Sequence, residues 1–304
     1  MKYIIFLLLL SNYFTAIYAN GPMLFNQNKQ TPEFDSKDKK AHKKNPLSDK
    51  SFAELKAEKE KALKAKDLAT AVKYLDAMRG ACTDPEILKD ILLEMADIYF
   101  ELQDWTKSER AYNEFVLLYP GAIRCDYAHY RAIICGMNLT LSPDRDQTKT
   151  QETLKLAEQF FTDHPKSTYL EKVTKLATEC REKLLESDIS IFDFYMHSNN
   201  FKAAQKRLDL IAKEHIPQLP TCQPRTLELS IQLAQAQNNT ESVLRTQLEL
   251  GQKFPEHEIT KRLAVDLPSI KTQLASLEQL KALPVELTQE QTTVAQASTQ
   301  KITT

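Results

Sequence analysis

The sequence is poor in glycine, with 5 glycines among 304 residues. Tight β-turns and phosphate-cradling loops both depend on glycine, because glycine adopts positive φ at little cost. The low glycine content therefore argues against a turn-rich sheet or barrel and against a nucleotide-binding fold. The chain also contains no P-loop, GxGxxG or GxSxG motif. We expect a mostly helical protein.

Clusters of metal-ligating or nucleophilic residues are also missing. The six histidines include no HExxH pattern and no pair at metal-binding spacing with a cysteine, and the five cysteines form no CxxC pair. The sequence therefore predicts no metal, no cofactor and no enzymatic activity. A thiol enzyme stays open as an alternative, because a cysteine and a histidine distant in sequence can meet in a fold. Small buried thiols on helix faces are the simpler interpretation.

Neither sign of charge prevails. The chain has 40 Lys and Arg against 41 Asp and Glu, a formal net charge of -1. Nucleic-acid binding normally requires an excess of positive charge, so we predict no nucleic-acid partner.

Long hydrophobic runs are absent, and one short run stands at the N-terminus. In "MKYIIFLLLLSNYFTAIYAN" the apolar residues 4–10 are followed by polar residues and by a small residue, Ala19. A membrane span needs about 20 apolar residues, whereas this pattern is typical of a secretory signal peptide. We therefore expect residues 1–19 to be a signal peptide. This region contains no cysteine, so the lipid-attachment signal of a bacterial lipoprotein is expected to be missing.

Polar segments border the middle of the chain. Residues 20–50 include "SKDKKAHKK", a composition that cannot bury a core and that predicts a flexible basic linker. Residues 284–304 are rich in Thr and Gln and are expected to be disordered. A helical-repeat domain is thereby predicted at residues 51–283.

Apolar residues recur in this middle part at the spacing of an amphipathic helix. One such face comprises Leu88, Ile91, Leu92, Met95, Ile98 and Tyr99. Short polar breaks separate the helical stretches, and several end at a proline, which cannot continue a helix. These features predict an all-α, tetratricopeptide-like helical-hairpin solenoid of about five repeats. The expected helix pairs are 51–81, 84–120, 123–165, 185–217 and 223–255, with a further helical stretch to about Leu283.

One turn is longer than the tetratricopeptide template requires. Pro120 and Pro165 are further apart than the template's period of about 34 residues, and the surplus falls in "LTLSPDRDQTKTQ". The "DRD" of Asp144, Arg145 and Asp146 could be a catalytic acid cluster. Alternating charges also suit local ion pairs and helix capping. We expect an enlarged turn inside the third repeat.

A solenoid without chemistry of its own offers its surface to partners. Aromatic residues and arginine dominate interface energetics, so the candidate contacts are Trp105, Tyr127, Tyr130, Tyr195 and Arg207. Packing between helices is the alternative for the aromatic residues. Arg207 lies off the apolar face of its helix and is expected to be exposed.

A series of motifs resembles the BamD (YfiO, ComL) family, the tetratricopeptide-repeat subunit of the bacterial β-barrel assembly machine, the BAM complex. The series comprises "CDYAHY", "DRD", "FFTDHPKSTY", "REKLLESDISIFDFY" and "FKAAQKRL". The positions that match the family are Asp126, Tyr127, Tyr130, Asp144, Arg145, Asp146, Pro165, Tyr169 and Tyr195. Arg207 follows two small residues, as does the family arginine that contacts BamA.

The resemblance implies a non-enzymatic scaffold in the periplasm, associated peripherally with the inner face of the outer membrane. Its implied partners are the last POTRA domain of BamA and unfolded outer-membrane proteins. The turn after the first repeat, "MRGACTDPE", lacks the family's aromatic residues, so no substrate-binding residues carry over. The alternative function is that of another exported tetratricopeptide-repeat adaptor, associated with the envelope or with division.

Overall fold

A computed structural model describes residue 47 and residues 49–282. The predicted signal peptide, most of the predicted linker and the predicted tail lie outside these residues, and their assignments stay predictions. Every regular element within the described ranges is a helix. The all-α fold is confirmed. None of the described helices is long and apolar enough to cross a membrane.

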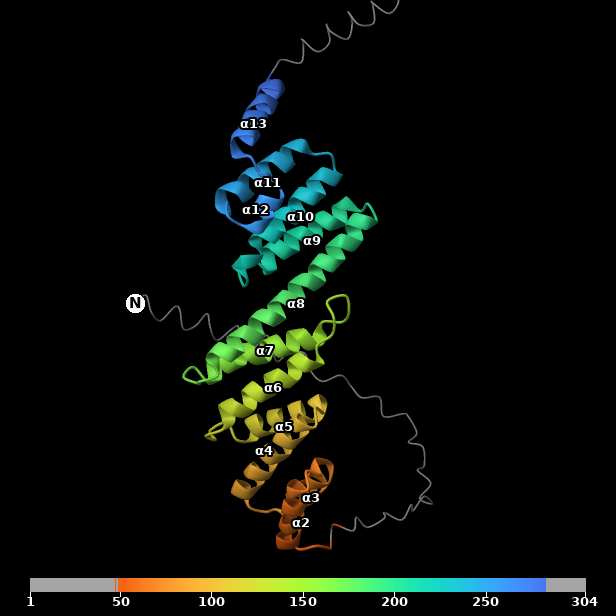
Figure 1. The fold of residues 1–304 in the computed structure, drawn as a ribbon, viewed down its shortest axis with the longest axis vertical. Coiled ribbons are helices and arrows are strands. Elements are labelled where there is room, and N and C mark those ends of the chain that lie inside the picture. The colour runs from red at the N-terminus through yellow and green to blue at the C-terminus, as the bar shows by residue number, and fades with distance from the viewer. Residues whose placement is uncertain (1–46, 48, 283–304) are drawn as a thin grey trace, which may run out of the picture. The chain divides into compact units, whose positions relative to one another are not determined.

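The helices pair in chain order (Figure 1). The pairs are α2 (Phe52–Lys64) with α3 (Leu68–Ala81), α4 (Pro85–Glu101) with α5 (Trp105–Leu118), α6 (Cys125–Leu139) with α7 (Thr148–Asp163), α8 (Leu170–His197) with α9 (Phe201–Glu214), and α10 (Gln223–Ala236) with α11 (Thr240–Lys253). The second helix of each pair also packs against the first helix of the next pair. This succession is the predicted tetratricopeptide-like solenoid, and the described residues contain the expected five hairpins.

Four of the five hairpins share one turn. A non-glycine residue with positive φ is followed by an Asp or Asn that caps the next helix, in the pairs Lys66 and Asp67, Gln103 and Asp104, Asn199 and Asn200, and Asn238 and Asn239. The capping residue's own N–H returns to a carbonyl five residues earlier, which is the Schellman bond. The sequence thus ends one helix and starts the next within three residues. The turn between α6 and α7 is the exception.

Helix α8 begins earlier than predicted. The fourth repeat was expected to start at residue 185, whereas α8 runs unbroken from Leu170 to His197, 28 residues. No proline or glycine interrupts this stretch. Its first half packs with α7 through Val173 and Ala177, and its second half packs with α9 through Ile189 and Phe192. One helix therefore serves two hairpins.

The end of the described chain covers the last hairpin, as expected of a cap. It consists of two helices, α12 (Glu258–Arg262) and α13 (Leu267–Ala282), where one continuous stretch was predicted. Pro268 suits the first turn of α13 and would break a longer helix. Helix α13 packs on α11, with Ile270 and Leu274 in contact with Leu244.

Candidate functional site

The start of α6 holds a polar network that reaches back to α4 and α5. Asp97 of α4 accepts hydrogen bonds from the hydroxyls of Tyr112 (2.5 Å) and Tyr127 (2.8 Å), and Arg124 pairs with it at 3.4 Å. The Tyr112 side chain is fully buried. Burial, followed by the bond to Asp97, raises the pKa of the Tyr127 phenol. The two phenols therefore stay neutral donors that fix the Asp97 carboxylate.

Two arginines lie over the aromatic rings of this network. The Arg124 guanidinium lies 4.6 Å from the centre of the Tyr127 ring, and the Arg131 guanidinium lies 3.4 Å from that of Phe100. Arg131 also donates to the Tyr112 hydroxyl at 3.3 Å. We call Asp97, Phe100, Tyr112, Tyr127 and the two arginines the Asp97 niche. In it, arginine stacks on aromatic rings near a carboxylate, a favourable arrangement for a guanidinium.

Most of the family-matching positions around α6 and the start of α8 meet one another. The rings of Tyr130 and Tyr169 stack at 4.7 Å with an angle of 17°, and the Lys172 ammonium lies within 5.7 Å of both ring centres. Asp126 accepts a hydrogen bond from Ser167 at 2.7 Å. The contacts of Tyr127, Tyr130 and Tyr169 are those of inter-helix packing. The predicted positions thus fix α6 against the start of α8.

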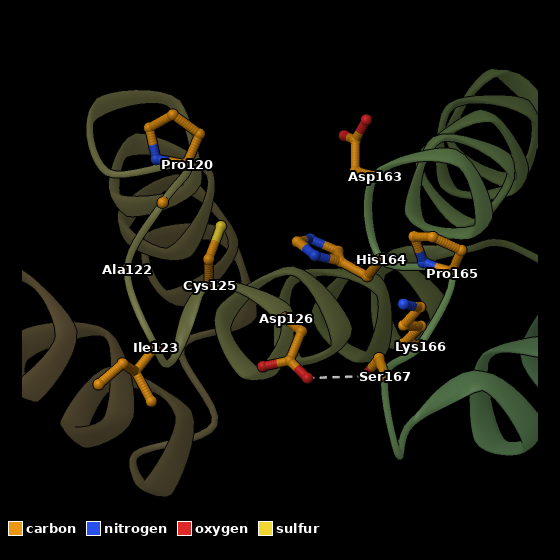
Figure 2. Close-up of a pocket in the computed structure, with 11 residues that line it drawn as sticks. Pro120, Ala122, Ile123, Cys125, Asp126, Asp163, His164, Pro165, Lys166 and Ser167 are labelled. Carbon is orange, nitrogen blue, oxygen red and sulfur yellow. Dashed lines mark hydrogen bonds between the residues drawn. The ribbon is translucent and has the colours of Figure 1, made fainter.

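A groove runs beside the bond between Asp126 and Ser167 (Figure 2). It lies between residues 120–126, around the start of α6, and residues 163–167, which follow the end of α7, and has a volume of about 350 Å³. Figure 2 shows the His164 ring pointing toward Cys125 at the start of α6, with Pro165 on the side away from Cys125. Ile123 is 98% exposed at the edge of the groove. A second cavity of about 610 Å³ adjoins it, lined by Leu117 and His129 among others.

His129 is a buried histidine without charge. It is 2% exposed, and its ring lies 5.4 Å from that of His164 at 80°. Its Nε2 faces the Leu156 carbonyl at 3.1 Å. Because a carbonyl only accepts, Nε2 carries the proton, and Nδ1 has no partner among the described residues. Burial, followed by the proximity of His164, lowers the pKa of His129 to about 4. The described residues contain no group of three or more side chains that could hold a metal ion.

The neutrality of His129 makes the stability of the fold dependent on pH. The unfolded chain takes up the proton near the ordinary pKa of 6.5, and the folded chain takes it up only near 4. Between these values the unfolded state binds more protons, so stability is complete above pH 6.5 and falls as the pH decreases. At pH 5.5 the loss from this group is expected to be about 1 kcal/mol relative to pH 7.5.

Urea unfolding of the wild type and of His129→Gln at the two pH values measures this loss. The glutamine amide can also donate to Leu156 but does not titrate, so the variant is expected to lose about 1 kcal/mol less on acidification. Equal losses in both proteins would show that His129 is not the group responsible.

The "DRD" segment forms the enlarged turn between α6 and α7, as predicted. Asp144, Arg145 and Asp146 are exposed. Asp146 accepts from the backbone N–H (3.0 Å) and the hydroxyl (2.8 Å) of Thr148 at the start of α7. The sequence did not point to Gln147, which is buried and donates to the carbonyls of Ser142 and Arg145. The segment is thus organised as a capping loop.

Arg207 and Tyr195 belong to a different part of the solenoid from the α6 residues. The Nη1 of Arg207 donates to Asp188 of α8 at 2.7 Å, and Asp188 also meets the His215 Nε2 at 2.7 Å. We expected Arg207 to be exposed. The ion pair with Asp188 covers much of its side chain, which is 25% exposed, so Arg207 is only partly accessible. Tyr195 is half-buried and packs edge to face against Phe194, with ring centres 5.6 Å apart.

The five cysteines are all unpaired, and four of them are buried. Burial raises the pKa of Cys135 and of Cys180 to about 11. A thiolate is the reactive form of cysteine, so these two thiols are unsuited to nucleophilic chemistry at neutral pH. This observation favours the interpretation of the cysteines as small core residues.

The five helical hairpins, each packed on the next, define a tetratricopeptide-like repeat protein. A family model of outer membrane lipoproteins, named YfiO, matches residues 48–242. The chain belongs to this YfiO family, which is exported and associated with the envelope. Because the family consists of lipoproteins, the match does not support the expectation that a lipid-attachment cysteine is missing. The first cysteine of the given sequence is Cys82.

Solved structures with a similar arrangement are distant in sequence. A tetratricopeptide repeat protein from Parabacteroides merdae is 12% identical, with 74% of this chain and 97% of that chain covered and a TM-score of 0.31. PilW, a type IV pilus biogenesis factor, is 14% identical, with 70% and 98% covered and a TM-score of 0.26. Similarity at this level does not bear on function. No curated protein matches the chain.

Proposed function

We propose that the protein is a non-enzymatic scaffold of outer-membrane β-barrel assembly, which docks on a BamA-like POTRA domain and helps to receive unfolded outer-membrane proteins. Membership of the YfiO family supports this function. The observation that carries the docking site is Arg207, at the family's BamA-contacting position, held in place by Asp188 and still partly exposed.

The ion pair with Asp188 orients Arg207 and uses only part of its capacity to donate hydrogen bonds. A guanidinium has five N–H donors, and the bond from Nη1 to Asp188 uses one of them. Asp188 is fixed in turn by His215 through its other oxygen. The remaining donors of Arg207 can therefore meet a carboxylate of the partner in a preorganised geometry.

Affinity purification from detergent-solubilised envelopes, with partners identified by mass spectrometry, tests the proposal. Removing one member of a desolvated interfacial charge pair costs about 2–5 kcal/mol, so Arg207→Gln is expected to weaken recovery of the BamA-like partner at least about thirtyfold. Asp188→Asn is the matched control, because it removes the internal pair and keeps the arginine. This control is expected to retain most of the binding.

Two results would contradict the proposal in different ways. Losses of binding in Arg207→Gln and Asp188→Asn that are equal and accompanied by equal losses of thermal stability would show that Arg207 acts only within the fold. If the wild type recovers no BamA-like protein, the assembly function is wrong, and envelope-division proteins in its place would support the adaptor alternative. Thermal unfolding of each variant shows whether a loss of binding reflects a loss of folding.

A further inference from the structure

A cavity of about 550 Å³ lies between the "DRD" turn, the second half of α8 and the start of α10. Its lining includes Pro143, Asp144, Glu186, Asp193, Phe194 and Arg225. We call it the Phe194 pocket. Neither the proposed docking through Arg207 nor the packing of the hairpins uses it.

Phe194 is the apolar part of this pocket. Its side chain is 66% exposed, whereas Phe192, two residues earlier on the same helix, is fully buried. Pro143, from the turn between α6 and α7, brings further apolar surface to the lining. Exposed aromatic residues in a concave surface are the usual anchors of a protein interface.

The charged residues of the pocket leave negative charge unbalanced. Asp144, Glu186 and Asp193 have no ion-pair partner among residues 47 and 49–282. The cation in the lining, Arg225, pairs with the buried carboxylate of Glu228 at 2.5 Å, which Arg262 also contacts, so these three groups carry one positive charge against the three carboxylates. The pocket therefore combines an open aromatic ring with carboxylates that a cation can complement.

The Asp97 niche shows how this chain completes such a combination elsewhere. There a carboxylate lies beside aromatic rings, and Arg124 both pairs with Asp97 and lies over Tyr127. The Phe194 pocket has the ring and the carboxylates, but no described cation lies over the ring of Phe194. The same chemistry favours arginine over lysine, because a planar guanidinium can stack and donate at the same time.

We propose that the Phe194 pocket binds an arginine side chain of a partner protein. The guanidinium stacks on the Phe194 ring and donates to the carboxylates of Asp193 and Glu186, and apolar residues beside the arginine cover Pro143. The partner thus presents a basic segment with adjacent aliphatic residues.

The Phe194 pocket and Arg207 face different sides of α8. Glu186, Ser190, Asp193 and His197 follow one another at steps of three or four residues and form one stripe of the helix. Asp188, which pairs with Arg207, comes two residues after Glu186 and two residues before Ser190. Two residues turn an α-helix by roughly 200°, so Asp188 lies on the side opposite the stripe. A partner in the Phe194 pocket is thus additional to the proposed BamA-like partner.

Fluorescence anisotropy of the full chain with a labelled peptide, Gly-Arg-Leu-Arg-Leu-Arg-Gly, tests the inference. The wild type is expected to bind this peptide, to bind its lysine version several times more weakly, and to leave its citrulline version unbound. Phe194→Leu keeps an apolar side chain without the ring and is expected to weaken binding about three- to tenfold. Asp193→Asn combined with Glu186→Gln is expected to weaken it about tenfold or more.

Asp188→Asn and Arg207→Gln are the matched controls, and both are expected to bind the peptide like the wild type. They separate this inference from the proposed BamA docking, since either can fail alone. The inference is wrong if the wild type does not bind the arginine peptide, if it binds the citrulline peptide equally well, or if Phe194→Leu changes nothing. A concentration-dependent dimer in sedimentation velocity that Phe194→Leu abolishes would assign the pocket to a second copy of the chain instead.

Discussion

Tyr112→Ala is expected to lower the free energy of unfolding by about 3–5 kcal/mol, the range for removing a large buried aromatic side chain. The Tyr112 side chain is fully buried between α4 and α6 and contributes to one hydrophobic cluster with Phe115 and Ala132. Its loss leaves a cavity, and it also removes one donor to Asp97 and one acceptor for Arg131. Urea denaturation at a fixed pH, followed by circular dichroism, measures the change.

Tyr112→Phe separates the two contributions of this residue. It keeps the ring and removes only the hydroxyl, so the expected loss is about 1–3 kcal/mol, from the bonds to Asp97 and Arg131. Asp97 retains Tyr127 and Arg124 in this variant. If Tyr112→Ala costs no more than Tyr112→Phe, the ring does not contribute the packing energy inferred here.

Gly136→Ala is expected to destabilise the protein by about 1–3 kcal/mol, although alanine is the better helix former. A Cβ at position 136 of α6 would lie 2.5 Å from the Thr153 Oγ1 and 3.0 Å from its Cγ2 on α7. Thr153 cannot easily rotate away, because it is buried and its hydroxyl donates to the Lys149 carbonyl at 2.8 Å. Glycine here allows the two helices to approach closely.

Gly80→Ala is the matched control, with the opposite sign. Gly80 is also helical, but nothing lies within 4 Å of its added Cβ, so the variant is expected to be more stable by about 0.5–1 kcal/mol. Thr153→Ala should in turn restore part of the stability lost in Gly136→Ala, because it removes the clashing atoms. A Gly136→Ala protein as stable as Gly80→Ala would contradict the close approach of α6 and α7.

The hairpins were predictable because their signals are local. Polar breaks and prolines placed the five helix pairs, and the repeated step from a residue with positive φ to a capping Asp67 or Asn200 explains why those breaks are so short. The start of α8 was missed although its signal was present. Val173, Ala177 and Cys180 continue the apolar spacing upstream of residue 185, but the repeat template assigned that stretch to no helix.

The polar networks were not predictable, because they depend on which side chains three helices bring together. Asp97 meets Tyr112 and Tyr127 across 15 and 30 residues of sequence, and no local pattern marks it. The motifs did indicate Asp126, Tyr127 and Tyr169 as positions of interest. Sequence could not distinguish packing from binding for these residues, since an aromatic ring serves both purposes.

The continuity of α8 affects how the solenoid can come apart. In repeat proteins the natural points of separation are the turns, where a hairpin can detach from its neighbour with few broken bonds. The third and fourth hairpins are joined more firmly, because the two halves of the 28-residue α8 pack against α7 and against α9 respectively. Separating α7 from α9 requires either breaking α8 or detaching one of its halves, so α7 and α9 are tied into one cooperative unit of unfolding. A force or a bound partner that acts on one of these hairpins therefore also changes the stability of the other.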